Sequence, residues 1–333
     1  MVDTDLAAPD ARSVVSEQEA PVGRPRDVQR TFQLVLATVW LTDAVLQIQP
    51  FMFTRGSNGF SGMLHGMASG NPGIVARTIT WNASIVYHQP VLTNALFALI
   101  QFVIAFGIVF PRTVRPALAL SIIWALAVWW FGEGVGGIFL GTGTPLGGGP
   151  GGVLYYAVLA VVLWPHQGSD EPFVAARAVG AHVARLIWVG LWGLLAVLAL
   201  VGSGRQPEAL HDLVSNLAAG QPGWLEHIDK VSSVFLLHHG TATAIVLAIV
   251  CVLAGVSVYL SPSFMRLMIV VVAVVFAVIW IAVENLGGIL AGGATDPNSG
   301  PLVILLALLY WPVSPTAISH HRGDHVAYRV AGL

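Results

Sequence analysis

Two stretches of this sequence decide the fold: VWWFGEGVGGI at residues 128–138 and VIWIAVENLGGI at residues 278–289. In each stretch an apolar run ends near a glutamate, Glu133 or Glu284, and a Gly-Gly pair follows. Further pairs agree at almost the same offset along the chain: Pro111 with Pro262, Arg115 with Arg266, His88 with His238, and the segment 70–73 with 220–223. Agreements that recur in the same order predict an internal duplication.

The composition is far more apolar than that of a soluble protein. Of the 333 residues, 56% are hydrophobic and 10% are charged, and the mean hydropathy is +0.76. Soluble domains carry about 25% charged residues, so these values predict an integral protein of the cell membrane. The formal net charge of −2 argues against nucleic acid as a partner.

Apolar runs of bilayer length predict helical spans, because a backbone exposed to lipid must satisfy its own hydrogen bonds. Six long runs lie near residues 32–49, 91–110, 116–132, 184–202, 241–260 and 267–285, and two shorter runs lie near 152–164 and 301–314. The expected fold is an all-α integral membrane protein of about eight transmembrane helices. Each half contributes four helices, an even number, so we expect two tandem four-helix units in parallel orientation.

The expected domains are a disordered polar tail at 1–30, a first four-helix unit at 31–166, a cytoplasmic linker at 167–183, a second four-helix unit at 184–314 and a cytoplasmic tail at 315–333. With both termini in the cytoplasm, eleven of the 15 Lys and Arg residues fall on the cytoplasmic side, as the positive-inside rule requires. The long segments 50–90 and 203–240 then lie outside, where we expect partly helical caps.

Several segments give the chain a resemblance to a known family. They are LTDAVLQIQPFMF at 41–53, the Gly-x-Pro-Gly turns, the histidine before the second span, PRTVRPAL at 111–118, WWFGEGVGG at 129–137 and TDPNSGPLVILLALL at 295–309. The four-helix unit resembles the DoxX-like family, which includes the small, DoxD-type subunit of thiosulfate:quinone oxidoreductase. The resemblance implies a multi-pass protein of a bacterial membrane, often associated with redox partners. It carries no catalytic residues over to this chain.

Paired histidines and glutamates are the first candidates for a site. Glu133 and Glu284 fall at the outer ends of the third and seventh spans, while His88 and His238 fall at the outer starts of the second and sixth. We therefore expect a His–Glu neighbourhood in each unit, either as a proton-handling pair or as a polar site for a quinone head group or other small ligand. The alternative is structural: each glutamate caps backbone amides of its own Gly-Gly turn.

Asp43 is an acid within the first expected span that the duplication does not repeat. Aligning Trp40 with Trp192 places Leu195 opposite Asp43, and Gln47 lies four residues further on the same helix face. An intramembrane carboxylate present in one half makes the first unit the better candidate for function. The alternative is a hydrogen bond from Asp43 to a neighbouring helix.

The sequence offers few ligands for a metal. Met63, His65 and Met67 could bind copper(I) through soft donors, but methionines in an amphipathic cap usually pack. His88 and His238 could also ligate haem. The single cysteine, Cys251, allows no internal disulfide and no Cys-x-x-Cys redox pair.

These features favour a subunit or accessory of a quinone-linked membrane redox system, with quinone as the possible cofactor and an oxidoreductase as the possible partner besides membrane lipid. A small-solute permease or channel that uses the interface between the halves is the alternative from another functional class. A membrane assembly factor without a site of its own is the third.

Overall fold

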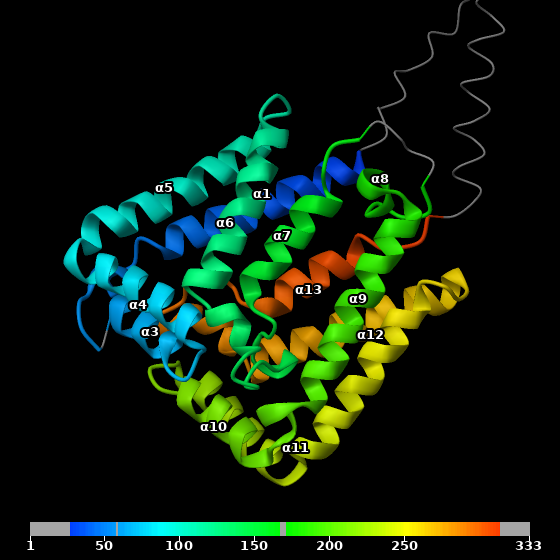
Figure 1. Ribbon diagram of the computed structural model, residues 1–333. Coiled ribbons are helices and arrows are strands. Elements are labelled where there is room, and N and C mark those ends of the chain that lie inside the picture. Colours follow the sequence, from blue (N-terminus) through cyan, green and yellow to red (C-terminus); the bar gives the residue numbers. More distant parts are fainter. Residues whose placement is uncertain (1–26, 58, 167–170, 314–333) are drawn as a thin grey trace, which may run out of the picture.

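The computed structural model describes residues 27–57, 59–166 and 171–313, and within these ranges the chain forms helices and no strands (Figure 1). The first half contains α1 Val28–Leu46, α2 Pro50–Phe53, α3 Phe60–Ala68, α4 Gly73–His88, α5 Pro90–Val109, α6 Val114–Phe131, η1 Gly134–Gly137, η2 Pro145–Gly147 and α7 Gly152–Val162. The second contains α8 Ala176–Val179, α9 Ala181–Leu200, η3 Gly202–Arg205, α10 Pro207–Leu217, α11 Gly223–Ser257, α12 Pro262–Ala282, η4 Asn285–Ala291 and α13 Ser299–Leu308. Most of the two predicted tails lies outside the described residues.

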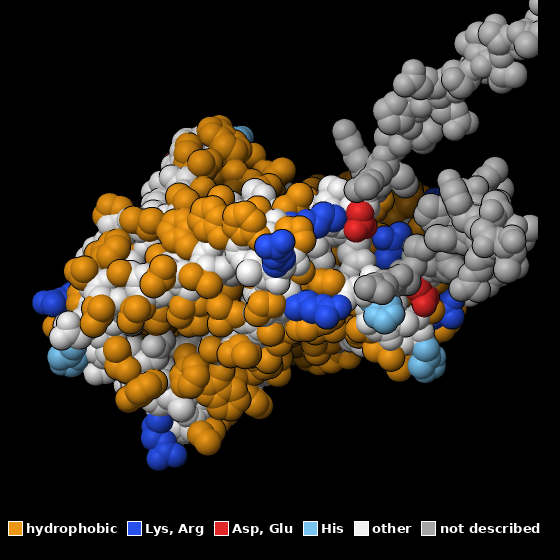
Figure 2. Space-filling view, turned by 90° about the horizontal axis from the view of Figure 1, so that it is seen from above, with side chains coloured by type: hydrophobic (Ala, Val, Ile, Leu, Met, Phe, Trp, Pro, Cys, Tyr) orange, Lys and Arg blue, Asp and Glu red, His pale blue; other side chains and the backbone are white. Residues whose placement is uncertain are grey.

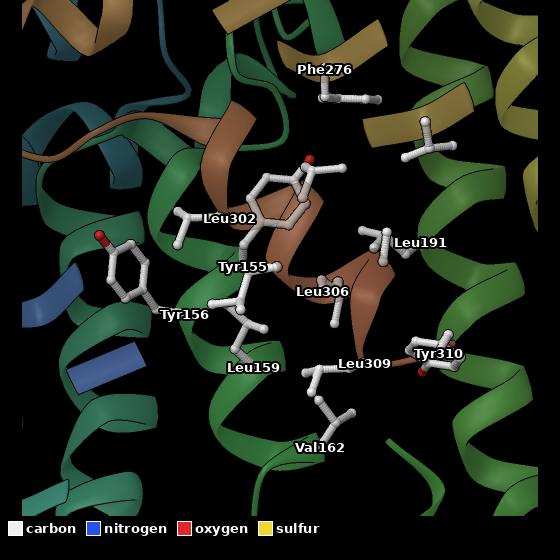
Figure 3. Packing of buried hydrophobic residues seen from close by; sticks show 14 of the residues in the cluster. Tyr155, Tyr156, Leu159, Val162, Leu191, Phe276, Leu302, Leu306, Leu309 and Tyr310 are labelled. Carbon is white, nitrogen blue, oxygen red and sulfur yellow. The ribbon is translucent and has the colours of Figure 1, made fainter. Parts of the chain in front are cut away.

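The short helices α7 and α13 lie in the middle of the molecule, between the long helices of the two halves (Figure 1). On one side α1 packs on α5 and α6 packs on α7, while on the other α9 packs on α11 and α12 packs on α13. Figure 3 shows Leu159 and Val162 of α7 beside Leu306 of α13 and Leu309, which follows the end of that helix. All four side chains are fully or almost fully buried, so the centre of the fold is an apolar contact between its two shortest core helices.

Five described helices are long and apolar enough to cross a membrane: α5, α6, α9, α11 and α12 with its extension to Ala291. This agrees with a multi-pass membrane protein. The other three expected spans do not meet that criterion. α1 has 19 residues, but Gln29, Arg30, Gln33 and Asp43 make it too polar on average. α7 and α13 have 11 and 10 residues, and at about 1.5 Å per residue these two helices reach only about half of a ~30 Å hydrocarbon core.

The helix α11 differs from the prediction of a separate cap and span. It runs without a break over 35 residues, whereas the first half has α4 and α5 separated at Gln89. Pro90, which has no backbone N–H, begins α5. Gly240 occupies the middle of α11, where α10 approaches so closely that a Cβ would lie 3.0 Å from Cα of Pro207. The expected cap at 203–240 is therefore α10 plus the first half of a longer helix.

The surface is consistent with a lipid environment. Many large side chains of the long helices are exposed, among them Leu99 and Phe106 of α5 and Val246 and Ile249 of α11. Figure 2 shows a face dominated by hydrophobic side chains, with charged ones in small groups. Exposed apolar area of this extent is unusual for a soluble monomer.

Candidate ligand site

A left-handed turn follows each of the two glutamates that ended the quoted stretches. Residues 134–137 have φ between 57° and 70°, and residues 285–288 have φ between 52° and 74°. Non-glycine residues pay about 1–2 kcal/mol in this conformation, which explains the Gly-Gly pairs. Beyond each turn, a tryptophan of the preceding helix holds the returning loop: Trp129 Nε1 donates to the Pro150 carbonyl and Trp280 Nε1 to the Pro297 carbonyl, both at 2.7 Å.

Each glutamate carboxylate caps the N terminus of a short central helix. Glu133 Oε1 accepts a hydrogen bond from the amide of Val153 at 3.3 Å, at the start of α7. Glu284 Oε2 accepts one from the amide of Gly300 at 3.1 Å, at the start of α13. Free amides and the helix dipole favour a carboxylate in this place. Each glutamate is therefore a cap, as the structural alternative held, but it caps the next helix and not its own Gly-Gly turn.

The two carboxylates differ in what their second oxygen meets. Glu284 is 2% exposed, and its Oε1 accepts a hydrogen bond from the hydroxyl of Ser299. Glu133 Oε2 is buried without a hydrogen-bond partner. Gly152 precedes Val153 as Ser299 precedes Gly300, so the hydroxyl that completes the second site has no equivalent in the first. Gly151, at φ 119°, lets Glu133 approach the loop, because a Cβ there would lie 2.3 Å from Oε2.

Glu133 lines a cavity of about 620 Å³ between the helices of the first half and parts of the second, namely Leu213 of α10, Gly287 of the left-handed turn and the loop before α13. Helices α1, α3, α4, α5 and α6 contribute to its wall, and the loop before α13 contributes Thr295, Asp296 and Asn298. The aromatic lining residues are Trp40, Phe60, Trp81, Phe97, Trp124 and Phe131, and the polar side chains include Asp43, Gln47, Asn71, Asn82, Gln101 and Glu133. Small-molecule sites commonly combine apolar walls with a few polar groups at about this volume.

Five side-chain atoms in the lining are buried without a hydrogen-bond partner. They are Asp43 Oδ1, Asn71 Oδ1, Gln101 Oε1, Trp124 Nε1 and Glu133 Oε2. Most buried polar atoms in native proteins have a partner in the protein or in ordered water. An unmet donor or acceptor costs about 1–3 kcal/mol, so this concentration around one cavity marks it as a place for polar contacts from a bound molecule or water.

Asp43 reaches the cavity from α1 and is 2% exposed. Beside its carboxylate lies the hydroxyl of Tyr156, which has no partner with hydrogen-bond geometry. The Tyr156 ring packs on Trp40 with ring centroids 4.4 Å apart. In Figure 3, Tyr155 and Tyr156 leave α7 in different directions, so one helix serves both the central core and the wall by Asp43. Gln47, one turn along α1, is fixed by hydrogen bonds with Asn94.

The cavity concentrates acidic groups. Burial, and then the charge of Asp296, raises the pKa of Glu133 to about 8. The carboxylate of Asp296 accepts hydrogen bonds from the hydroxyl of Thr295 and from the amide of Asn298. Within the described ranges, the residues that line the cavity include Asp43, Glu133 and Asp296 but no Lys, Arg or His. A neutral or cationic occupant fits this lining better than an anion.

The expected histidine–glutamate neighbourhoods do not form. His88 ends α4 on the surface, where Nδ1 contacts the Ser84 carbonyl at 2.8 Å. His238 is exposed on α11 and contacts the Val234 carbonyl in the same way. In the described chain no hydrogen bond or ion pair joins either histidine to Glu133 or Glu284. Both rings instead bond within their own helix, one turn back.

The soft donors of α3 do not converge either. Met63 and Met67, one turn apart, line the cavity, whereas His65 lies on another face of the helix, with Nδ1 2.9 Å from the Ser61 carbonyl. Among the described residues, no group of three or more His, Cys, Asp or Glu side chains is placed to hold a metal ion.

Sequence reasoning identified Asp43 and Glu133, which the structure brings to one cavity, and it missed Asn71, Gln101, Trp124 and Asp296. Asn71 and Asp296 stood within quoted segments, but nothing in their spacing indicated a shared site. Comparisons with protein-family models, with curated proteins and with solved structures found no significant match to this chain.

Proposed function

We propose that this chain is a multi-pass membrane protein of two tandem four-helix units, both termini cytoplasmic, and that its first unit binds a small ligand in the cavity. The tandem arrangement is supported by matched contacts: the tryptophan–proline bonds at Trp129 and Trp280, and the helix caps at Glu133 and Glu284. In this arrangement α7 and α13 are the fourth and eighth spans, each completed by the loop before it.

The five unpartnered polar atoms around the cavity carry the ligand-binding proposal. A ligand that satisfied them would recover part of about 1–3 kcal/mol for each atom. The second unit gives the contrast, because Ser299 already satisfies Glu284 from within the protein. Ser299 therefore gives the second oxygen of Glu284 a hydrogen-bond donor, whereas Gly152 leaves the second oxygen of Glu133 without one.

A role as subunit or accessory of a quinone-linked redox system is the first use we propose for the cavity. It rests on the DoxX-like resemblance, the aromatic walls and two possible donors to quinone carbonyls. These donors are Trp124 Nε1, which has no partner, and the Glu133 carboxyl, which a pKa of about 8 keeps protonated at neutral pH. The second candidate is a solute-binding permease, which the three acids of the lining favour.

The test is the Gly152→Ser variant, purified in mild detergent beside the wild-type protein. The new hydroxyl would supply Glu133 with the donor that Ser299 gives Glu284. A Cβ at Gly152 would lie 3.3 Å from Asp296 Oδ1, so a small local adjustment accommodates it. We expect a small molecule to co-purify with the wild type and to be absent from the folded variant, measured by native mass spectrometry and by absorbance of the organic extract. Equal ligand content in two folded proteins would contradict the proposal.

A further inference from the structure

We infer that the cavity takes a small organic cation, a protonated amine carried on an apolar group. The inference rests on the proposed ligand-binding cavity and follows the second of its two candidate uses, solute binding; it concerns the chemical class of the occupant. It follows from three independent properties of the lining: which hydrogen-bonding atoms are free, which charges are present, and what covers the walls.

The free atoms are mostly acceptors. When the two carboxyl groups are ionised, Asp43 Oδ1, Asn71 Oδ1, Gln101 Oε1 and Glu133 Oε2 accept hydrogen bonds, and Trp124 Nε1 is the one donor among these five buried, unpartnered atoms. The amide of Asn71 is oriented by its own Nδ2, which donates to the Met67 carbonyl at 2.8 Å. An ammonium group brings up to three N–H donors and no acceptor, and it therefore complements a wall that offers mainly acceptors.

The fixed charges have the same preference. Asp43, Glu133 and Asp296 line the cavity, and the lining residues that the structure describes contain no cationic side chain to pair with them. A buried carboxylate without a partner either binds a proton or requires a countercharge. A bound ammonium supplies that countercharge, so binding of the cation releases the proton that the empty cavity holds.

The walls suit both ends of such a ligand. Trp40, Trp81 and Trp124 belong to the lining together with three phenylalanines. Aromatic faces attract cations and also cover apolar groups. An ammonium ion without an attached apolar group would leave much of this wall uncovered. The wall therefore indicates an amine that carries a ring or a short hydrocarbon.

The same reasoning gives one site per chain. Leu195 stands where the alignment of the two halves would repeat Asp43, and Leu195 is fully buried in the core. In the second half the Glu284 carboxylate is held by Ser299 and Gly300. Asp296 comes from the second half but lines the cavity of the first.

The experiment is isothermal titration calorimetry on the full chain in detergent with three probes. These are 2-phenylethylamine, its neutral analogue 2-phenylethanol, and a quinone with one isoprene unit. We expect 2-phenylethylamine to bind once per chain and at least about tenfold more tightly than the alcohol, as 1.4 kcal/mol of charge-dependent binding would give. Asp43→Asn should weaken amine binding at least about tenfold and weaken alcohol binding much less, because the asparagine oxygen still accepts a hydrogen bond but carries no charge.

Glu226→Gln is the matched control, because Glu226 is an acid outside the cavity, paired with Lys230 at 2.7 Å on α11. It should bind the amine as the wild type does. Equal affinity for amine and alcohol, or quinone binding without amine binding, would overturn the inference and leave a ligand-binding cavity in place. Binding of none of the probes, with no co-purified ligand, would remove the proposed function as well. If Asp43→Asn does not fold, the amine–alcohol comparison on the wild type decides alone.

Discussion

The hydroxyl of Ser299 donates a hydrogen bond to the carboxylate of Glu284, and both residues are almost fully buried. One hydroxyl thus closes the second polar centre of the molecule. In the first centre Gly152 offers no such group, and Glu133 Oε2 stays free beside a cavity. The two glutamates looked equivalent in sequence. They differ in one hydrogen-bond donor, because Ser299 supplies a hydroxyl to Glu284 and Gly152 supplies none to Glu133.

Ser299→Ala should destabilise the protein. It removes a donor to a buried carboxylate and leaves that oxygen without a partner, at a cost of about 1–3 kcal/mol. Thermal unfolding in detergent, followed by circular dichroism, should show a lower Tm than the wild type. Ser215→Ala is the control, because Ser215 lies exposed on α10. An unchanged Tm for Ser299→Ala would mean that the hydroxyl does not support Glu284.

Stability should fall as the pH rises through the range in which Glu133 loses its proton. Its pKa in the folded protein is raised to about 8 from an ordinary value of 4.5. The folded state thus binds this proton more tightly than the unfolded state. The stabilisation that proton binding gives is complete below about pH 4.5 and is lost as the pH rises through about 8. The groups around Glu133 are Asp43, Asp296, Tyr155 and Tyr156.

The measurement is the Tm of the wild type and of Glu133→Gln at pH 5, 7 and 9. Glutamine does not titrate, so we expect the variant to lose less Tm between pH 5 and 9 than the wild type. Parallel pH profiles for the two proteins would show that another group governs the dependence.

Amine binding should strengthen as the pH rises. The cation requires the charged carboxylate, and Glu133 is protonated below about pH 8. If one proton is released for each amine bound, the affinity for 2-phenylethylamine should rise by up to about tenfold for each pH unit between 6 and 8. Calorimetry in buffers of different ionisation enthalpy counts the released protons directly. A pH-independent affinity would contradict the exchange of a proton for the ligand.

The proposed orientation can be tested with single cysteines. Cys251 is the single cysteine and is buried. A Cys251→Ala background therefore has no thiol and should give no labelling by a membrane-impermeant maleimide. Thr54→Cys and Thr113→Cys place thiols at two exposed threonines that flank helices of the first unit. In intact cells the reagent should label position 54 and should reach position 113 only after lysis. The opposite pattern would reverse the topology.

Part of the candidate site could be predicted from local sequence. Glu133 was found because a carboxylate at the end of an apolar run is costly, and Asp43 because an acid within a helix of bilayer length is rare. Both arguments concern the cost of burial, and both residues line the cavity. The Gly-Gly pairs also indicated a turn, although not its left-handed form.

The rest depends on tertiary packing that local sequence does not encode. His88 and Glu133 were paired because the ends of neighbouring spans should meet at one membrane face. The chain instead places His88 at the end of the separate helix α4, bonded to its own backbone. Asp296 reaches the first half from the loop before α13, far along the chain. Its partnership with Glu133 follows from the central packing of α7 against α13.

The break between α4 and α5 has a mechanical consequence. In the second half one continuous helix of 35 residues, about 52 Å long, transmits any tilt of its buried end to its outer end as a stiff rod. In the first half Gln89 and Pro90 interrupt that rod, so the direction of α4 is set more by its packing on α3 than by α5. Trp81 and Asn82 of α4 belong to the cavity wall. The half with the open carboxylate thus has a break in its long helix near the cavity wall, whereas the half with the closed carboxylate has an unbroken one.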